Sequence, residues 1–159
     1  MKFQGTEAIE TQGVLSPDGR WLAYTSDESG QFEIYVRPFP SGPGRWKVSA
    51  GGVRNHEPQW RRDGKELFFV ENAFPNNRLM AVAVQSGPRG EFRAGAPQAL
   101  FAFRTVGGAP PTTSQRYSPS ADGQRFLVQV QPDAPAPTLS VITNWEKAAL
   151  ARHYATRQD

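Results

Sequence analysis

The sequence predicts an all-β fold built from repeated antiparallel sheets. The first observation behind this prediction is a turn dipeptide that recurs between a polar lead-in and an apolar run, at Asp18-Gly19, Asp63-Gly64 and Asp122-Gly123. Asp-Gly favours a hairpin because glycine adopts a positive φ without steric cost and the Asp side chain can bond the backbone of its own turn. The second observation is composition, since 15 glycines and 14 prolines in 159 residues indicate many turns.

The third observation is the spacing of these turns. The first Asp lies 45 residues before the second, and the second lies 59 residues before the third. A period of about 40 to 50 residues is typical of propeller blades, each of which is a small antiparallel sheet. An insertion at residues 107–111 explains the longer second interval. The three units are therefore interpreted as neighbouring blades of a β-propeller.

Each unit is expected to contain up to four short strands in chain order. The strands directly after the turns are rich in aromatic and branched side chains, at residues 21–25, 67–70 and 126–130. A second strand follows in each unit, at residues 32–36, 79–84 and 139–142. Third strands at 46–49 and 98–103 lead to the first strands of the next units, at 57–60 and 115–118.

The third unit has no outer strand in the sequence pattern. Asn144 instead precedes a stretch of Ala, Leu, Glu and Lys, which predicts an Asn-capped helix at about residues 145–153. The fold class expected is a partial β-propeller of about two complete antiparallel blades plus an incomplete third, with a short C-terminal helix. Residues 1–159 form a single propeller segment, with blades at about 12–50, 57–103 and 115–143.

The repeats resemble a known family. The segments SPDGRWLAYTSDESGQFEIYVRPFP, GGVRNHEPQWRRDGKELFFV and YSPSADGQRFLV resemble the TolB-like β-propeller repeats at the C-terminal end of many bacterial serine/threonine protein kinases, over about residues 12–146. Two departures are Arg61-Arg62 where the first turn has Ser-Pro, and the extra Ala121 before the third turn. The resemblance implies a propeller and, in the kinase context, a sensory or scaffolding role. The same repeat also serves translocation proteins and peptidase gating domains, so it does not fix a function.

The number of units has a consequence for partners. Closed propellers typically have at least four blades, whereas this chain has two and a partial third. Such an arc exposes a sheet face at each end, a kind of surface that marks an interface. The expected partners are therefore the missing blades of a longer chain or a second copy that closes the ring, together with a protein or small-molecule ligand that the sequence does not name.

Catalytic motifs are not found in the sequence. The glycine-rich stretch from Gly42 to Lys47 fails as a kinase phosphate loop at its third glycine, and Ser49 lacks the first glycine of a hydrolase elbow. The chain has no cysteine and two histidines, and the turn aspartates lack the closely spaced oxygen ligands that calcium needs. No catalytic, metal or cofactor residue is expected, and the Asp-Gly pairs are interpreted as structural turns.

A possible binding rim lies between the first two blades, at Arg54, Asn55, His56 and Glu57. Connections of this kind lie at one mouth of a propeller, where ligands usually bind. The alternative is a loop whose polar groups bond its own backbone.

Eight aromatic residues occupy strand positions and could stack on sugars or bases, but packing between blades explains them better. They are Trp21, Tyr24, Phe32, Tyr35, Trp60, Phe68, Phe69 and Phe126.

Charge and hydropathy argue against two classes of partner. The net charge is +3, but Lys and Arg are scattered, which favours a solvated surface over a nucleic-acid site. No apolar run approaches the roughly 20 residues of a membrane span, so no membrane insertion is expected and the compartment stays unassigned. The function expected is a non-catalytic protein or ligand interaction module. The alternative is the propeller portion of an enzyme, a peptidase or a polysaccharide lyase, that gates or carries an active site.

Overall fold

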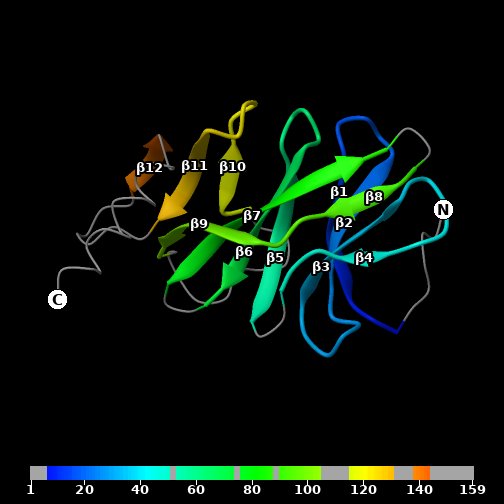
Figure 1. Cartoon of the computed structure of the whole chain (residues 1–159). Coiled ribbons are helices and arrows are strands. Elements are labelled where there is room, and N and C mark those ends of the chain that lie inside the picture. The colour runs from blue at the N-terminus through cyan, green and yellow to red at the C-terminus, as the bar shows by residue number, and fades with distance from the viewer. Residues whose placement is uncertain are drawn as a thin grey trace.

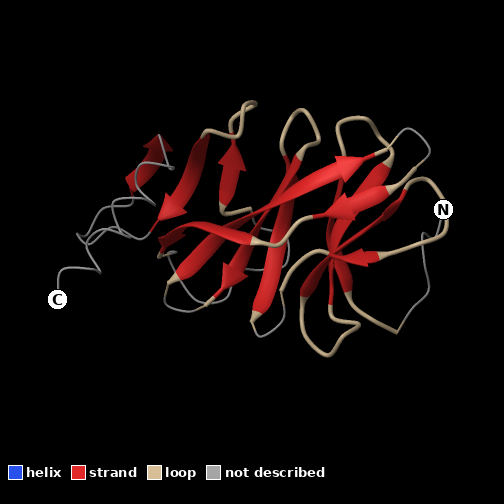
Figure 2. Cartoon of the chain, in the orientation of Figure 1, coloured by secondary structure: helices blue, strands red, loops and turns tan. Residues whose placement is uncertain are grey.

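The computed structural model describes residues 7–50, 53–73, 76–87, 90–104 and 115–130, and the backbone of 138–143. Within these ranges every regular element is a strand, and the strands form three antiparallel sheets that lie side by side (Figures 1 and 2). The prediction of an all-β partial propeller is confirmed. The helix expected at 145–153 and the insertion at 107–111 lie outside the described residues.

The first sheet follows chain order from its inner to its outer edge. It consists of β1 (Glu10–Leu15), β2 (Trp21–Ser26), β3 (Glu33–Pro38) and β4 (Trp46–Lys47), and each strand pairs with the next. Consecutive antiparallel strands with tight turns need no crossover, so the local hairpin signals are sufficient to specify this sheet.

The second sheet has the same order but a divided outer edge. It contains β5 (Arg54–Trp60), β6 (Glu66–Asn72), β7 (Asn77–Ser86), β8 (Phe92–Ala94) and β9 (Gln98–Phe103). Both β8 and β9 pair with β7, one along each half of that strand. The sequence pattern predicted β9. It predicted neither β8 nor the last two residues of β7, because the short segment between β7 and β9 looks like a turn in the sequence.

The third sheet has three strands in the described residues. They are β10 (Tyr117–Pro119), β11 (Arg125–Val130) and β12 (Thr138–Thr143), again in chain order. In Figure 1 this sheet lies at the opposite end of the arc from the first sheet, with the second sheet between them. The first and third sheets therefore each have one face that no other described sheet covers.

The three Asp-Gly turns have the same internal chemistry. In each, the Asp Oδ1 accepts the backbone N–H of the residue two positions later, at 3.1 Å from Arg20, 3.0 Å from Lys65 and 3.0 Å from Gln124. The glycines have φ values of 69°, 72° and 70°. This left-handed conformation favours glycine, so the repeated dipeptide follows directly from the turn geometry.

Two apolar clusters join the sheets, and β6 contributes to both because its side chains alternate between its faces. Leu67 and Phe69 pack on the first sheet, whereas Phe68 and Val70 pack on the third. Seven of the eight aromatic residues expected to fill these layers are buried, and Phe32 is half-buried. The central sheet is thus covered on both faces, which fixes it between its neighbours.

The third turn also packs against the second sheet, which yields a prediction. A Cβ placed on Gly123 would lie 2.8 Å from Arg61 Cδ and 3.1 Å from Phe68 Cζ, whereas a Cβ on Gly19 meets nothing within 4 Å. Gly19→Ala should cost about 1 kcal/mol of unfolding free energy from the positive φ alone. Gly123→Ala should cost roughly 1 to 3 kcal/mol more because of overpacking. Urea denaturation of both variants measures the difference, and equal losses would contradict this packing.

Candidate functional site

The four residues predicted as a binding rim form the beginning of β5 and are not a connecting loop. Asn55 and Glu57 are buried, His56 is half-buried and Arg54 is exposed. The neighbouring glycines and Pro58 made this segment look irregular in the sequence. Proline is tolerated here because β5 is an edge strand and the pairing register with β6 shifts between His56 and Gln59.

The shift is a β-bulge that recurs in the first sheet. Gln12 and Glu57 have φ values of 55° and 61°, and each lies where the register of its inner strand breaks. Each also stands six residues before the Asp of its turn, and Arg116 holds that position in the third unit. We call Gln12, Glu57 and Arg116 the inner-strand triplet, since they occupy equivalent places in or next to the first strands of the three sheets.

The inner-strand triplet connects the sheets through hydrogen bonds. Gln12 Oε1 accepts the backbone N–H of Glu57 at 2.9 Å, and it also accepts the hydroxyl of Thr25 at 3.0 Å. Glu57 Oε2 in turn accepts the backbone N–H of Arg116 at 2.8 Å. At both junctions, therefore, a side-chain oxygen of one sheet binds the backbone amide of the equivalent residue in the next sheet.

The second junction adds a buried ion pair. Arg116 Nε donates to Glu57 Oε1 at 2.7 Å, and the two side chains are 3% and 1% exposed. Tyr117 donates its hydroxyl to the Glu57 carbonyl at 2.8 Å, and complete burial raises the pKa of Tyr117 well above its usual value. A carboxylate held by two donors at such low exposure is poorly placed to act as a general base. Its role here is to hold the third sheet against the second.

Asn55 belongs to a second buried cluster. Its Nδ2 donates to Glu33 Oε2 at 2.9 Å, and the Ser49 hydroxyl donates to the same carboxylate oxygen. Ser49 Oγ also accepts the backbone N–H of Ile34 at 2.9 Å. Ser49 follows β4 and is 6% exposed, so its hydroxyl is committed to joining strands of the first sheet. Both the hydroxyl and its carboxylate partner are buried between strands, so Ser49 is poorly placed to meet a substrate.

His56 is held in its neutral form. Its ring lies 5.1 Å from the ring of Phe32, and the Arg54 guanidinium lies over that same ring at 5.9 Å. Burial, together with the positive charges of Arg116 and Arg54, lowers the pKa of His56 to about 4. The imidazole therefore carries no charge near neutral pH.

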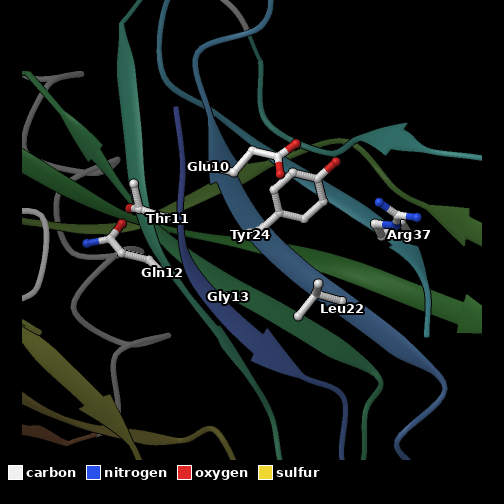
Figure 3. A pocket seen from close by; sticks show the side chains of 7 residues that line it. All are labelled: Glu10, Thr11, Gln12, Gly13, Leu22, Tyr24 and Arg37. Atoms are coloured by element: carbon white, nitrogen blue, oxygen red, sulfur yellow. The ribbon is translucent and has the colours of Figure 1, made fainter. Parts of the chain in front are cut away.

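The uncovered face of the first sheet contains a cavity of about 310 Å³ (Figure 3). Leu22, Tyr24 and Arg37 line it from neighbouring strands, and the side chain of Gln12 points away from them. The ring of Tyr24 stacks on Tyr35 at 6.0 Å, and its hydroxyl oxygen is buried with no hydrogen-bond partner in the described part of the chain. Burial and the nearby carboxylates of Glu28 and Glu10 raise the pKa of Tyr24 to about 12. Sequence reasoning missed this cavity, because Gln12 and Leu22 carry no local binding signal.

The described residues contain neither a metal-binding cluster nor a membrane-spanning helix. No group of three or more His, Asp or Glu side chains lies together in a way that could hold a metal ion. Within the same residues, the structure contains no helix of the length and apolarity needed to cross a membrane.

Comparison with known proteins supports the fold. No family model matches the chain. A stretch of 53 residues is 36% identical to Tricorn protease homolog 1 of Streptomyces coelicolor, covering 33% of this chain and 5% of that protein. A solved structure assigned as TolB from Agrobacterium tumefaciens has a TM-score of 0.50 at 20% identity, and the match covers 64% of this chain and 36% of that one.

Two further solved structures have the same level of similarity. A puromycin-hydrolyzing peptidase of Mycobacterium tuberculosis has a TM-score of 0.52 at 15% identity, over 84% of this chain and 29% of that one. A protein assigned as a 6-phosphogluconolactonase from Bacteroides uniformis has a TM-score of 0.51 at 14% identity, over 88% and 42%. The chain thus spans less than half the length of each of these proteins. These structures show that the fold is that of a TolB-like propeller, and at such identities they show the fold alone.

The buried ion pair yields a prediction with a graded series. Glu57→Leu leaves Arg116 buried without its carboxylate and should cost about 3 to 5 kcal/mol of unfolding free energy. Glu57→Gln keeps an acceptor for the Arg116 amide. Gln12 shows that a Gln can adopt the positive φ of this position, so the loss should be about 1 to 3 kcal/mol. Glu66→Gln, which breaks the more exposed pair with Arg61, is the matched control and should cost less than about 1 kcal/mol. Urea denaturation that ranks the three variants equally would contradict the role assigned to Glu57.

His56 yields a prediction of pH dependence. Its pKa of about 4 in the folded protein lies below the ordinary 6.5 of the unfolded chain, so only the unfolded chain binds a proton between these values. Its contribution to stability is complete above pH 6.5 and is lost as the pH falls toward 4. His56→Phe keeps the ring beside Phe32 but cannot titrate, so its unfolding free energy should fall less over this window. Thermal or urea unfolding between pH 4 and 8 measures this, and parallel curves throughout would show that His56 does not titrate in this way.

Proposed function

We propose that the chain is a non-catalytic interaction module, the C-terminal part of a TolB-like propeller that binds a protein or a small ligand. The observation that supports this proposal is that polar residues on and near the inner strands are buried and hydrogen-bonded within the structure. Glu57, Arg116 and Asn55 are buried and bonded between strands or sheets, and Ser49 is bonded to Glu33. Sheets whose polar groups are taken up in internal hydrogen bonds are rigid. They can hold loops and faces in place for binding a partner, and these polar groups are not free to react.

The wider context of the module is also part of the proposal. The repeat pattern resembles those at the C-terminal ends of bacterial serine/threonine kinases, which favours a sensory or scaffolding role in a signalling protein. A second candidate is the propeller portion of a peptidase that gates or carries an active site on another domain. The stretch that is 36% identical to a tricorn protease homolog favours this second candidate.

The absence of activity is testable on the purified chain. We expect no covalent labelling by a fluorophosphonate probe, which reports an activated serine, because the Ser49 hydroxyl is buried between strands where the probe does not reach it. We also expect no hydrolysis of peptide or lactone substrates. Labelling or turnover that disappears in Ser49→Ala would contradict the proposal and would identify a hydrolase. Turnover that persists in that variant would contradict it as well.

The binding role needs a separate measurement. A photo-crosslinking amino acid can replace Leu22, which lies half-buried in the uncovered cavity of the first sheet, or Arg93, which is exposed on β8. In cells that produce the protein, the position of Leu22 should give a discrete adduct that mass spectrometry identifies, and the Arg93 control should not. Equal, diffuse crosslinking at both positions would contradict a binding role for this face.

A further inference from the structure

The hydrogen bonds between sheets have a direction. The acceptor comes from the side chain in the earlier sheet and the donor is the backbone amide in the later sheet, from Gln12 to Glu57 and from Glu57 to Arg116. Since Gln12 lies at an equivalent bulge and has a positive φ close to that of Glu57, its own amide occupies the place that receives such a bond from a preceding sheet. The first sheet is therefore built like a later member of a series.

The apolar residues of the first sheet repeat this relationship. Counted from the turn Asp, Leu22 and Tyr24 correspond to Leu67 and Phe69 of the second sheet. In the second sheet these positions pack on the sheet before it, and Phe126 and Val128 do the same in the third. In the first sheet the corresponding face instead lines the cavity of Figure 3. The face has the residues that receive a neighbouring blade.

We propose that the uncovered face of the first sheet docks one further propeller blade, whose inner strand carries Glu or Gln six residues before its turn Asp. The oxygen of that side chain accepts the backbone N–H of Gln12, as Gln12 and Glu57 do at the two junctions inside the chain. Tyr24 differs from Phe69, its equivalent in the second sheet, in having a hydroxyl that is buried without a partner in the described residues, so we expect the new blade to supply an acceptor there. This proposal rests on the proposed role as a propeller module and specifies its partner.

A second copy of this chain would not supply the Glu or Gln acceptor that the proposal requires. Head-to-tail closure would place the third sheet before the first, but the triplet residue of the third sheet is Arg116, which has only donors. Its guanidinium turns back toward Glu57, and its two terminal nitrogens are buried without a partner in the described residues. The face of β11 that points away from the second sheet is also exposed and largely polar, with Arg125, Leu127 and Gln129. The occupant is therefore a different blade, one that belongs to a longer propeller chain.

The experiment supplies such a blade from the chain itself. A duplication of residues 8–52 places a second Gln12 45 residues ahead of the original, which is the native spacing between the first two units. Hydrogen exchange by NMR then measures the amide of the downstream Gln12. We expect this amide to exchange at least about tenfold more slowly than in the parent chain, because a buried, bonded amide exchanges only when the structure opens.

Variants of the upstream copy test the chemistry of the acceptor. Gln12→Glu in that copy should keep the protection, since Glu57 shows that a carboxylate serves equally, and Gln12→Leu should lose it. Leu22→Asp in the downstream copy is the second arm: it should abolish the protection in the duplicated chain but leave the parent chain folded, because Leu22 is only half-buried there. Circular dichroism confirms that each variant is folded.

Three outcomes would overturn the proposal. Protection that is equal in the Gln and Leu versions would show docking without the proposed bond. No protection in any version would show that this face does not receive a blade. Protection of Gln12 in the parent chain that rises with protein concentration would identify a second copy as the occupant. None of these readouts depends on hydrolase labelling or cellular crosslinking, so a failure here is distinguishable from a failure of the proposed function.

Discussion

The bond from an inner-strand side chain to the backbone amide of the next sheet is the interaction on which the arrangement of the sheets depends. Apolar packing brings the sheets together but is non-directional, so it specifies their separation better than their register. The hydrogen bonds from Gln12 to Glu57 and from Glu57 to Arg116 are directional, and each joins equivalent positions of adjacent units. The bulges that give Gln12 and Glu57 their positive φ are what make these positions special, because they break the local ladder.

The sequence predicts those parts of the fold that depend on local chemistry. The Asp-Gly turns, the strands that follow them and the all-β class come from residues close together in the chain, and all are present. The beginning of β5 at Arg54 was missed because glycines and Pro58 suggest a loop, and only pairing with β6 turns the segment into a strand. β8 was missed for a similar reason, since three residues with little pattern become a strand only by pairing with β7.

The candidate site was harder to predict than the fold. Arg54, Asn55, His56 and Glu57 do lie together, but whether a polar residue faces solvent or the next sheet depends on contacts with residues about 60 positions away, such as Arg116 with Glu57. A signal was nevertheless available: a long polar side chain, Gln, Glu or Arg, stands at the same offset before each of the three turn aspartates. The offset identifies the position, and only the structure identifies the bonds.

The change from Gln12 to Glu57 to Arg116 makes the two junctions different in kind. The first uses neutral hydrogen bonds, whereas the second buries a charged pair whose desolvation offsets much of its attraction. Such pairs add little net stability, but removing one partner is strongly unfavourable, so they discriminate against wrong neighbours. An arginine in the third sheet requires a carboxylate behind it and offers no acceptor ahead of it. The residue at the inner-strand triplet position thus specifies which sheet can precede or follow another. The two ends of the arc therefore differ as surfaces for partners.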